Sequence, residues 1–407
     1  MSMASIGALP NGGSCRTALS NEDIQGRDLF VSWCQDAGCE TTVDQVGNIY
    51  ARRRGTDASR LPVATGSHLD TQPHGGKFDG VYGVLAGLEV VRALNDADIE
   101  TLAPIDIIVW TNEEGARFSP PLAGSSAYAG ICSVESIHNA ITADGTTVRD
   151  DLSNSGYLGD SAPGERKLDG FIESHIEQGP ILEATNNTIG VVTRVQGIRW
   201  LTVTVNGQDA HAGTTPMNRR SDALTGAAKM ITRINDLVLA GDECIRATVG
   251  KLDVEPNSGA TIPGRVIFNC DLRHPDQATL ETLMLSIETE IETIASSAGL
   301  GVEFERPIQI PPTEFATELV DAIRASATAL RFANIDMLSG AGHDAMNVAR
   351  VARAAMIFVP CKDGISHNEA ESAKSTDLAA GAQTLLDVLL GQVGVVHPVS
   401  TEMARED

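Results

Sequence analysis

The chain has 407 residues, 42% of them hydrophobic, and a formal net charge of -24 at pH 7. That length exceeds the size at which a single hydrophobic core usually keeps growing, so we expect two domains. The negative charge would repel nucleic acids and anionic membranes. No run reaches the roughly 18 apolar residues of a membrane helix, and we therefore expect neither nucleic acid nor a membrane as a partner.

The amino terminus and the cysteines bear on the compartment. The start, MSMASIGALP, lacks the basic segment and the apolar core of a signal peptide, so we expect a cytoplasmic protein. The seven cysteines are odd in number and form no CxxC pair, which argues against a disulfide framework or a zinc ribbon. Cys361, in VPCKDG, remains open as an alternative nucleophile.

The first half of the chain alternates strand and helix patterns. We predict a buried strand in LPVATGSHLD, a helix in VYGVLAGLEVVRALNDA and a further strand in PIDIIVWTNEEG. Such alternation predicts an α/β fold with a mostly parallel sheet. Both strands end in polar residues, at the sheet edge where ligands of such folds gather.

Between residues 198 and 313 the pattern changes. A strand alternates Leu201, Val203 and Val205 with threonines, and a helix is predicted in SDALTGAAKMITRINDLV. A second strand, GRVIFNCDLR, and a long amphipathic helix, QATLETLMLSIETEIETIASSAG, follow. We expect residues 198–313 to form a smaller inserted α+β domain with a lid or dimerisation role.

Residues 1–197 and 314–407 would then form the catalytic domain. The α/β pattern resumes with a helix in TEFATELVDAIRASATAL, a strand in AAMIFVP and a last helix in STDLAAGAQTLLDVLLGQV.

Four polar clusters lie in the α/β parts. They are His68 with Asp70 and Asp79, the pair Glu113–Glu114, His175 in ESHIEQG, and His367 in GISHNEAE. Each alone could be a buried core histidine or a solvated loop, but together they form a ligand set that Zn²⁺ accepts. A tetrahedral zinc needs four ligands, and five candidates remain when one carboxylate is reserved as a base. The surplus suggests two ions that share a bridging carboxylate.

Local spacing refines this site. Asp70 lies two residues beyond His68, so we predict that Asp70 holds the second ring nitrogen of that histidine and fixes its tautomer. Glycines 75, 76 and 80 would let the loop double back, so that Asp79 meets His68 at the same ion.

Six motifs follow one another along the chain: GSHLDTQPHGGKFDGVYGVLAGLEV, TNEEGARF, ESHIEQGPILE, DAHAGTTPM, SGAGHDA and FVPCKDGISHNEAE. By these motifs the chain resembles the dinuclear-metal amidohydrolases. That group contains N-carbamoyl-L-amino-acid hydrolases, allantoate amidohydrolases and β-ureidopropionases, and it is related to aminoacylase and zinc carboxypeptidases. The resemblance runs from GGSCRTALS, near residue 12, to the last helix.

The resemblance implies two divalent metal ions in each subunit. Zinc is the first expectation, and manganese, cobalt and nickel tolerate the same ligands. The implied ligands are His68, Asp79, His175, Glu114 and His367, with Asp79 as the bridge. Glu113 would be the general base.

The resemblance also implies substrate contacts. His211 would stabilise the oxyanion across the contact of a homodimer, although a histidine there could also be an ordinary surface residue. Arg273 would pair with a substrate carboxylate, and the alternative is a strand-end salt bridge. Three further positions, Gln178, Gly340 and Gly342, are similar to substrate-contacting positions of the family.

His343 and Asp344 would support the metal ligands, or else cap a helix in DAMNVARVARA.

The chain departs from the family at one position. The family commonly reads PNxxNVIPG, and its second asparagine helps the arginine to hold the carboxylate; here EPNSGATIPG places Ala260 at that point. Loss of such a donor would cost on the order of 1.5–3 kcal/mol. Either Asn257 compensates, or the acid end of the substrate differs.

We expect hydrolysis of an N-carbamoyl-L-amino acid to the amino acid, carbon dioxide and ammonia. Allantoate or another ureido acid is the next hypothesis, and an aminoacylase or dipeptidase activity is the third. A non-catalytic binding protein would have lost the base or a ligand, yet Glu113 and all five ligand positions are present. A hydrolase that used Cys361 would survive treatment with a chelator.

Overall fold

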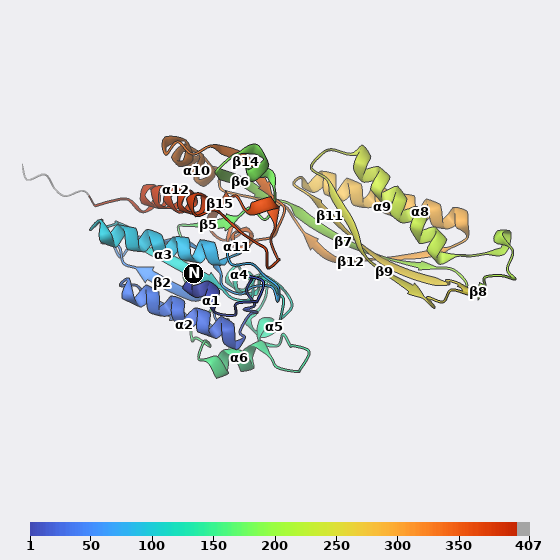
Figure 1. The fold of residues 1–407 in the computed structure, drawn as a ribbon, viewed down its shortest axis with the longest axis horizontal. Helices are drawn as coiled ribbons and strands as arrows, with labels where there is room; N and C mark the ends of the chain where they lie inside the picture. The colour runs from blue at the N-terminus through green and yellow to red at the C-terminus, as the bar shows by residue number, and fades with distance from the viewer. Residues whose placement is uncertain (397–407) are drawn as a thin grey trace, which may run out of the picture. The chain divides into compact units, whose positions relative to one another are not determined.

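The computed structural model describes residues 1–396, and the chain divides into two compact units (Figure 1). The larger unit comprises Met1–Thr193, Glu314–Met337 and the chain from Ala341 onward. The smaller unit comprises Arg194–Thr313 and Leu338–Gly340. Within the described range no helix has both the length and the apolar character needed to cross a bilayer.

A mixed sheet forms the centre of the larger unit. Its strands lie in the order β1-β2-β4-β3-β5-β15-β6-β13, and β14 pairs with β6. The four central strands, β4 (Ile105–Trp110), β3 (Val63–His68), β5 (Gly170–Ile176) and β15 (Arg353–Val359), run parallel. Their residues are almost all buried, as expected for parallel strands covered on both faces. The expected α/β fold with a mostly parallel sheet is confirmed.

The remaining strands of this sheet are β1 (Glu40–Val43), β2 (Ile49–Arg53), β6 (Ile189–Val195), β13 (Thr313–Glu314) and β14 (Asn334–Ser339). The helices of the unit are α1 (Ser2–Ser5), α2 (Asn21–Asp36), α3 (Val81–Asp96), α4 (Ala123–Tyr128), α5 (Val134–His138), α6 (Val148–Ser155), α7 (Ile181–Thr185), α10 (Thr317–Ala329), α11 (Asp344–Val348) and α12 (Ser375–Val393), with a short 3-10 turn at Lys362–Gly364.

Two predicted helices are shorter than their patterns. The helix expected from Thr313 begins only at Thr317, because the first two residues pair as β13. The helix expected over DAMNVARVARA ends at Val348, because the chain must turn before it enters β15 at Arg353.

The smaller unit contains an antiparallel sheet in the order β12-β7-β11-β9. Its elements are β7 (Gly197–Asn206), β8 (Ala210–His211), a 3-10 turn (Met217–Arg219), α8 (Ala223–Ala240), β9 (Arg246–Glu255), β10 (Thr261–Ile262), β11 (Arg265–His274), α9 (Gln277–Ala298) and β12 (Gly301–Ile310). Asp222 caps the start of α8 and Asp276 caps the start of α9. The side chain of each aspartate accepts a hydrogen bond from the main-chain N–H three residues later.

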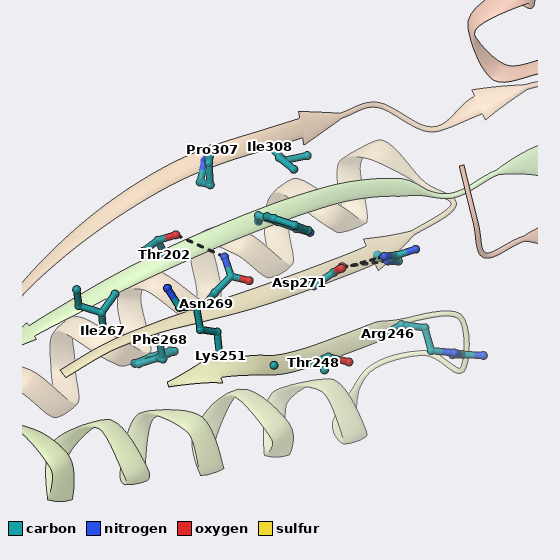
Figure 2. Close-up of a pocket in the computed structure, with 13 residues that line it drawn as sticks. Thr202, Arg246, Thr248, Lys251, Ile267, Phe268, Asn269, Asp271, Pro307 and Ile308 are labelled. Carbon is teal, nitrogen blue, oxygen red and sulfur yellow. Dashed lines mark hydrogen bonds and ion pairs between the residues drawn. The ribbon is translucent and has the colours of Figure 1, made fainter. Parts of the chain in front are cut away.

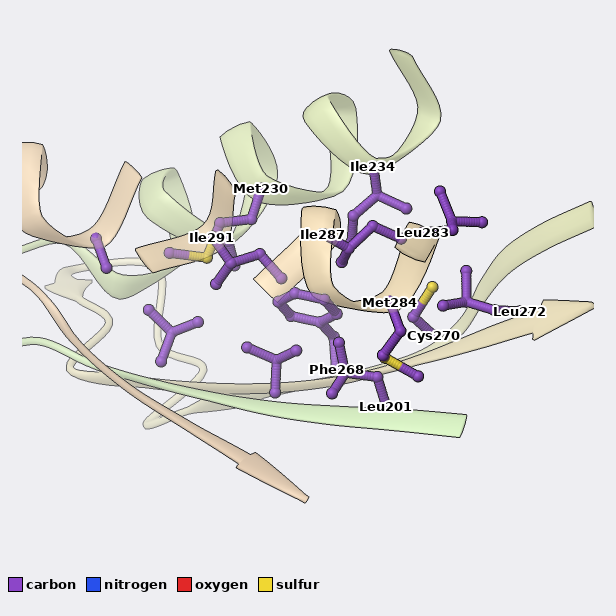
Figure 3. Close-up of a cluster of buried hydrophobic side chains, with 14 of the residues drawn as sticks. Leu201, Met230, Ile234, Phe268, Cys270, Leu272, Leu283, Met284, Ile287 and Ile291 are labelled. Atoms are coloured by element: carbon purple, nitrogen blue, oxygen red, sulfur yellow. The ribbon is translucent and has the colours of Figure 1, made fainter. Parts of the chain in front are cut away.

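The two faces of this antiparallel sheet differ. Alternate residues of β7 and β11 point to one open face, which carries side chains such as Thr202 and Asn269 (Figure 2). The other face packs against α8 and α9, with Phe268 of the sheet among Met230 and Ile287 of the helices (Figure 3). The core of the unit therefore lies on one side of the sheet only.

Candidate metal centre

The carboxyl ends of neighbouring parallel strands bring the predicted ligands together. His68 is the last residue of β3, Glu113 and Glu114 follow β4, and His175 lies at the end of β5. Because β4, β3 and β5 are adjacent and parallel, their ends meet at one edge of the sheet. His367 reaches the same place from the loop after β15.

Asp79 lies at the centre of the cluster. Its Oδ1 lies 3.7 Å from Nε2 of His68 and 3.2 Å from Nε2 of His175. Its Oδ2 lies 3.3 Å from Nε2 of His367, and that nitrogen is also 3.3 Å from Oε2 of Glu114. Two groups of potential ligand atoms therefore share one carboxylate, and each group faces a different oxygen of it.

The histidines at this site present the correct nitrogen to a cation. Nδ1 of His68 donates to the main-chain oxygen of Asp70 at 2.8 Å, and Nδ1 of His175 donates to that of Ile176 at 2.9 Å. These bonds fix the tautomer in which Nε2 carries the lone pair. Burial also lowers the pKa of His68 to about 4, which keeps its ring neutral. In His175 the effect of burial is outweighed by Asp79, which raises the pKa to about 9, and a bound cation would have to displace that proton.

Burial and mutual repulsion disfavour negative charge on the two glutamates of the site. Burial raises the pKa of Glu114 to about 8, with Asp79 adding to the effect. Burial, followed by the charges of Asp344 and Glu114, raises the pKa of Glu113 well above its ordinary value. Nearby cations would remove this repulsion. The nitrogen and oxygen donors and the shared Asp79 therefore fit a pair of divalent cations.

Asp70 meets the second ring nitrogen of His68 through its main-chain oxygen and not through its carboxylate. The side chain instead accepts the main-chain N–H groups of Glu113 at 3.3 Å and Glu114 at 3.2 Å. The Asp70 side chain is turned toward the end of β4, where the N–H groups of Glu113 and Glu114 lie beyond the last residue of the strand. Asp70 therefore orients the two glutamates.

Sequence reasoning missed a support formed by Glu371. Its Oε1 accepts from the main-chain nitrogens of Phe78 at 2.8 Å and Asp79 at 3.2 Å, and its Oε2 accepts from Ser366 Oγ at 3.0 Å. Ser366 Oγ also lies 2.8 Å from Asp79 Oδ2. Glu371 thus ties the loop of Asp79 to the loop of His367. The motif GISHNEAE contains it, but nothing in the spacing distinguishes it from its acidic neighbour Glu369.

Two further supports were also missed. Gln72 donates from Nε2 to Glu114 Oε2 at 2.9 Å. Glu173 is fully buried, and it accepts from Ser67 Oγ at 2.6 Å and from the main chain of Ala345 at 2.8 Å. Glu173 therefore links β5 to Ser67 on β3 through one oxygen and to Ala345 on α11 through the other.

His343 and Asp344 are buried in the larger unit. The ring of His343 lies edge-on to His175, with centroids 4.6 Å apart, and its side chain makes no capping bond to α11. Asp344 contributes to the raised pKa of Glu113. This placement favours a supporting role beside the ligands over a helix cap.

Gln178 and Gly342 also belong to the larger unit. Gln178 has a left-handed backbone, with φ of 56°, and its Nε2 donates to Asp79 Oδ2 at 2.8 Å. Gly342 lies one residue before His343, beside Met346 and Leu122. Of the predicted substrate-contacting residues, Gln178 is therefore the one that touches a candidate metal ligand directly.

Cys361 does not have the properties of a nucleophile. It is buried, its Sγ faces the main-chain oxygen of Gly179 at 3.8 Å, and burial raises the pKa of the thiol to about 11. A protonated, buried thiol is unreactive.

The amino-terminal segment fastens the loop that follows His68. Arg16 is fully buried, and its Nε donates to the main-chain oxygen of Leu69 at 3.3 Å. Its main-chain N–H donates to Thr71 Oγ1 at 2.8 Å. Ser14 and Gly75 pair through both main-chain hydrogen bonds. The conformation of residues 69–75 therefore depends on residues 14–16.

The other predicted residues lie in the smaller unit. Arg273 pairs with Asp271 through two hydrogen bonds, at 3.0 and 2.9 Å, and donates to the main-chain oxygen of Gly340 at 2.7 Å. The salt bridge considered as an alternative is thus present. His211 is exposed on β8, which pairs with β10 in a two-stranded antiparallel sheet, and the main-chain N–H of Ala212 donates to the main-chain oxygen of Ala260 beside it. Asn257 is exposed in the loop between β9 and β10.

Comparison with known proteins identifies the family. Residues 64–391 match the model of peptidase family M20/M25/M40, and the chain belongs to this family, as the resemblance of the motifs predicted. The chain is 43% identical to an N-carbamoyl-L-amino-acid amidohydrolase of Rhizobium meliloti, over 98% of this chain and 95% of the relative. It is 34% identical to an allantoate amidohydrolase of Escherichia coli, over 94% of each chain.

Solved structures agree with this assignment. The fold superposes on an amidase of the hydantoinase/carbamoylase family from Burkholderia multivorans with a TM-score of 0.92 and 48% identity. That match covers 97% of this chain and 96% of the other.

Proposed function

We propose that the chain hydrolyses N-carbamoyl-L-amino acids at the ureido C–N bond. Water adds across this bond, and the products are the free amino acid, carbon dioxide and ammonia. The observation that carries the proposal is the Asp79 carboxylate, which is shared between two groups of ligand atoms with Glu113 beside them. The similarity to amidohydrolases that carry this name supports it.

The proposed metal ligands fall into two sets. His68 and His175 would hold one cation with Asp79 Oδ1, and Glu114 and His367 would hold the other with Asp79 Oδ2. Zinc is our first choice, because imidazole and carboxylate form its usual ligand set. Bound cations would supply Lewis acidity and make a water molecule acidic enough to lose a proton near neutral pH.

Glu113 is the proposed general base. Its Oε2 lies 3.5 Å from Nε2 of His68, and its side chain is 11% exposed, so it borders the cation site and remains open to water. Asp70 holds the main chain of Glu113 and Glu114, so that the first can face the water while the second faces a cation. Glu113 would accept the proton of the attacking water and pass it to the leaving nitrogen.

Arg273 and His211 complete the proposed machinery from the smaller unit, but they lie at opposite ends of its sheet. Arg273 pairs in register with Ile198 near the start of β7, and β8, which carries His211, follows Asn206 at the end of β7. Eight residue steps of about 3.3 Å separate these ends, or about 26 Å. A substrate held by Arg273 is out of reach of the same chain's His211. We therefore propose a homodimer in which His211 acts on the substrate of its partner.

Allantoate is the second candidate substrate. The similarity to an allantoate amidohydrolase supports it, and so does Ala260, which removes one predicted contact to a simple carboxylate. The same metal centre would serve both substrates, so only the substrate pocket distinguishes them.

A substrate panel on zinc-reconstituted protein tests the proposal. We expect ammonia and free amino acid from N-carbamoyl-L-amino acids, and no activity after treatment with a chelator until zinc returns. Glu113→Gln should retain bound zinc, because Glu113 is not a ligand, and should lose turnover. Release of amine from N-acyl amino acids only, with no ammonia from any ureido compound, would refute the proposal. Full activity of Glu113→Gln would exclude it as the base.

A further inference from the structure

The open face of the antiparallel sheet contains a groove beside Arg273. The groove has a volume of about 820 Å³, and residues of all four strands line it. Figure 2 shows Ile267 and Asn269 on one strand, with Pro307 and Ile308 on the far side of the groove. All of these residues belong to the smaller unit.

Trp200 is the largest side chain in this groove. On β7 it pairs in register with Asp271 on one side and with Ile308 on the other. Its side chain is 36% exposed and is therefore accessible to a ligand in the groove. Arg273 is its diagonal neighbour on β11, at a spacing that an indole ring can bridge.

Arg273 remains able to bind an anion. A guanidinium has five N–H groups, and the hydrogen bonds to Asp271 and Gly340 occupy three of them. The pairing also neutralises Asp271, so the carboxylate does not repel an anionic ligand at this end of the groove.

We infer that Trp200 and Ile308 form the subsite for the side chain of the substrate, and that the preferred substrates carry a large apolar or aromatic side chain. This inference rests on the proposed function, in which Arg273 holds the substrate carboxylate. In an amino acid the side chain and the carboxylate share one carbon atom. A side chain directed along the sheet from Arg273 therefore meets the indole ring of Trp200, against which aromatic and aliphatic groups pack favourably.

Trp200 and Ile308 disfavour allantoate. Allantoate would place a second ureido group at this position, and that group requires hydrogen-bond donors and acceptors. The groove also carries polar side chains, among them Thr202, Thr248 and Asn269. Selection against allantoate therefore rests on Trp200 and on Ile308 across the strand pair, whose apolar surfaces suit a phenyl or isobutyl group better than a ureido group.

The test compares kcat/KM for N-carbamoyl derivatives of L-phenylalanine, L-leucine and L-alanine, and for allantoate. We expect the phenylalanine and leucine derivatives to be preferred. Trp200→Ala should lower kcat/KM for them by about 10- to 100-fold and leave the alanine derivative within about threefold. Trp200→Phe should restore most of the loss. Thr204→Ala, four residues further along the same face of β7 and outside the groove, is the matched control and should behave as wild type.

The outcomes separate this inference from the proposed function. Preference for the alanine derivative or allantoate, or an equal loss with every substrate in Trp200→Ala, would overturn the subsite while ureido hydrolysis stands. If the zinc-loaded wild type releases ammonia from none of these compounds, the proposed function itself fails. Unfolding in urea should be similar for the three variants, because Trp200 and Thr204 lie on the face away from the core.

Discussion

Replacing Gly80 with alanine tests the geometry of the metal centre most directly. Gly80 has φ of 66° and ψ of -52°, in a turn where the N–H of Val81 donates to the main-chain oxygen of Asp79 at 2.7 Å. This is the γ-turn that residues with a side chain rarely adopt. An added Cβ would also lie 2.4 Å from the Cε1 and Nε2 atoms of His68.

Two costs follow from that substitution. The backbone conformation would cost about 1–3 kcal/mol in the free energy of unfolding. The ring of His68 would also have to move, although it is 2% exposed and fixed at Nδ1 by Asp70. Since a displaced ligand binds poorly, we expect zinc affinity to fall by about 10- to 100-fold.

The assay is zinc bound per chain at buffered free zinc, with urea unfolding of the metal-free protein alongside. Gly156→Ala is the matched control, because Gly156 has φ of 78° with no atom within 4 Å of an added Cβ. Gly156→Ala should lower the free energy of unfolding by about 1 kcal/mol and leave the zinc affinity unchanged. If Gly80→Ala bound zinc as tightly as wild type, the arrangement of His68 beside Gly80 would be wrong.

Three further substitutions probe the supports of the site and the core. Glu371→Ala should reduce zinc affinity by about 10-fold or more in the same assay, because the main chain of Asp79 loses its acceptor; unchanged affinity would exclude this support. Arg27→Met should lower the free energy of unfolding in urea by about 3–5 kcal/mol, because it leaves the buried Asp23 without its ion-pair partner. The double variant Arg27→Met, Asp23→Leu should recover much of this loss. Additive losses from the two substitutions would contradict the ion pair. Burial raises the pKa of Asp44 to about 6, so the folded protein binds this proton more tightly than the unfolded chain does. The contribution of Asp44 to the free energy of unfolding should therefore fall by up to about 3 kcal/mol as the pH rises from roughly 4 to 6. Asp44→Asn should flatten that part of the pH profile of unfolding, and a profile identical to wild type would refute the shift.

The parallel-sheet elements could be predicted from sequence because their patterns are strong. The strand of His68 and the helix that begins at Val81 were both expected, and both form. In the smaller unit, β9 and β12 were missed. Charged residues such as Lys251 and Glu303 break up their apolar patterns, and most residues of each strand are exposed. Local sequence gave little sign of strands that are stabilised mainly by pairing with β11 and β7.

Sequence reasoning selected the side chains that cluster at the candidate metal centre more completely than the residues that support them. Imidazoles and carboxylates at strand ends identify themselves by chemistry, so His68 and His175 could be selected. Asp70 could be selected too, but its partner could not, because spacing does not show which way a carboxylate turns. Glu371 acts through main-chain N–H groups nearly 300 positions away, and such contacts leave no pattern in a single sequence.

The attachment of Arg16 to the loop after His68 has a practical consequence for protein engineering. The region that matches the family model begins at residue 64, which invites expression of a trimmed fragment. Such a fragment would lack the hydrogen bonds that residues 14–16 make to residues 69–75, which lead to Asp79. An affinity tag joined close to these residues would strain the same hydrogen bonds, so a tag for metal-binding measurements should not be joined close to residues 14–16.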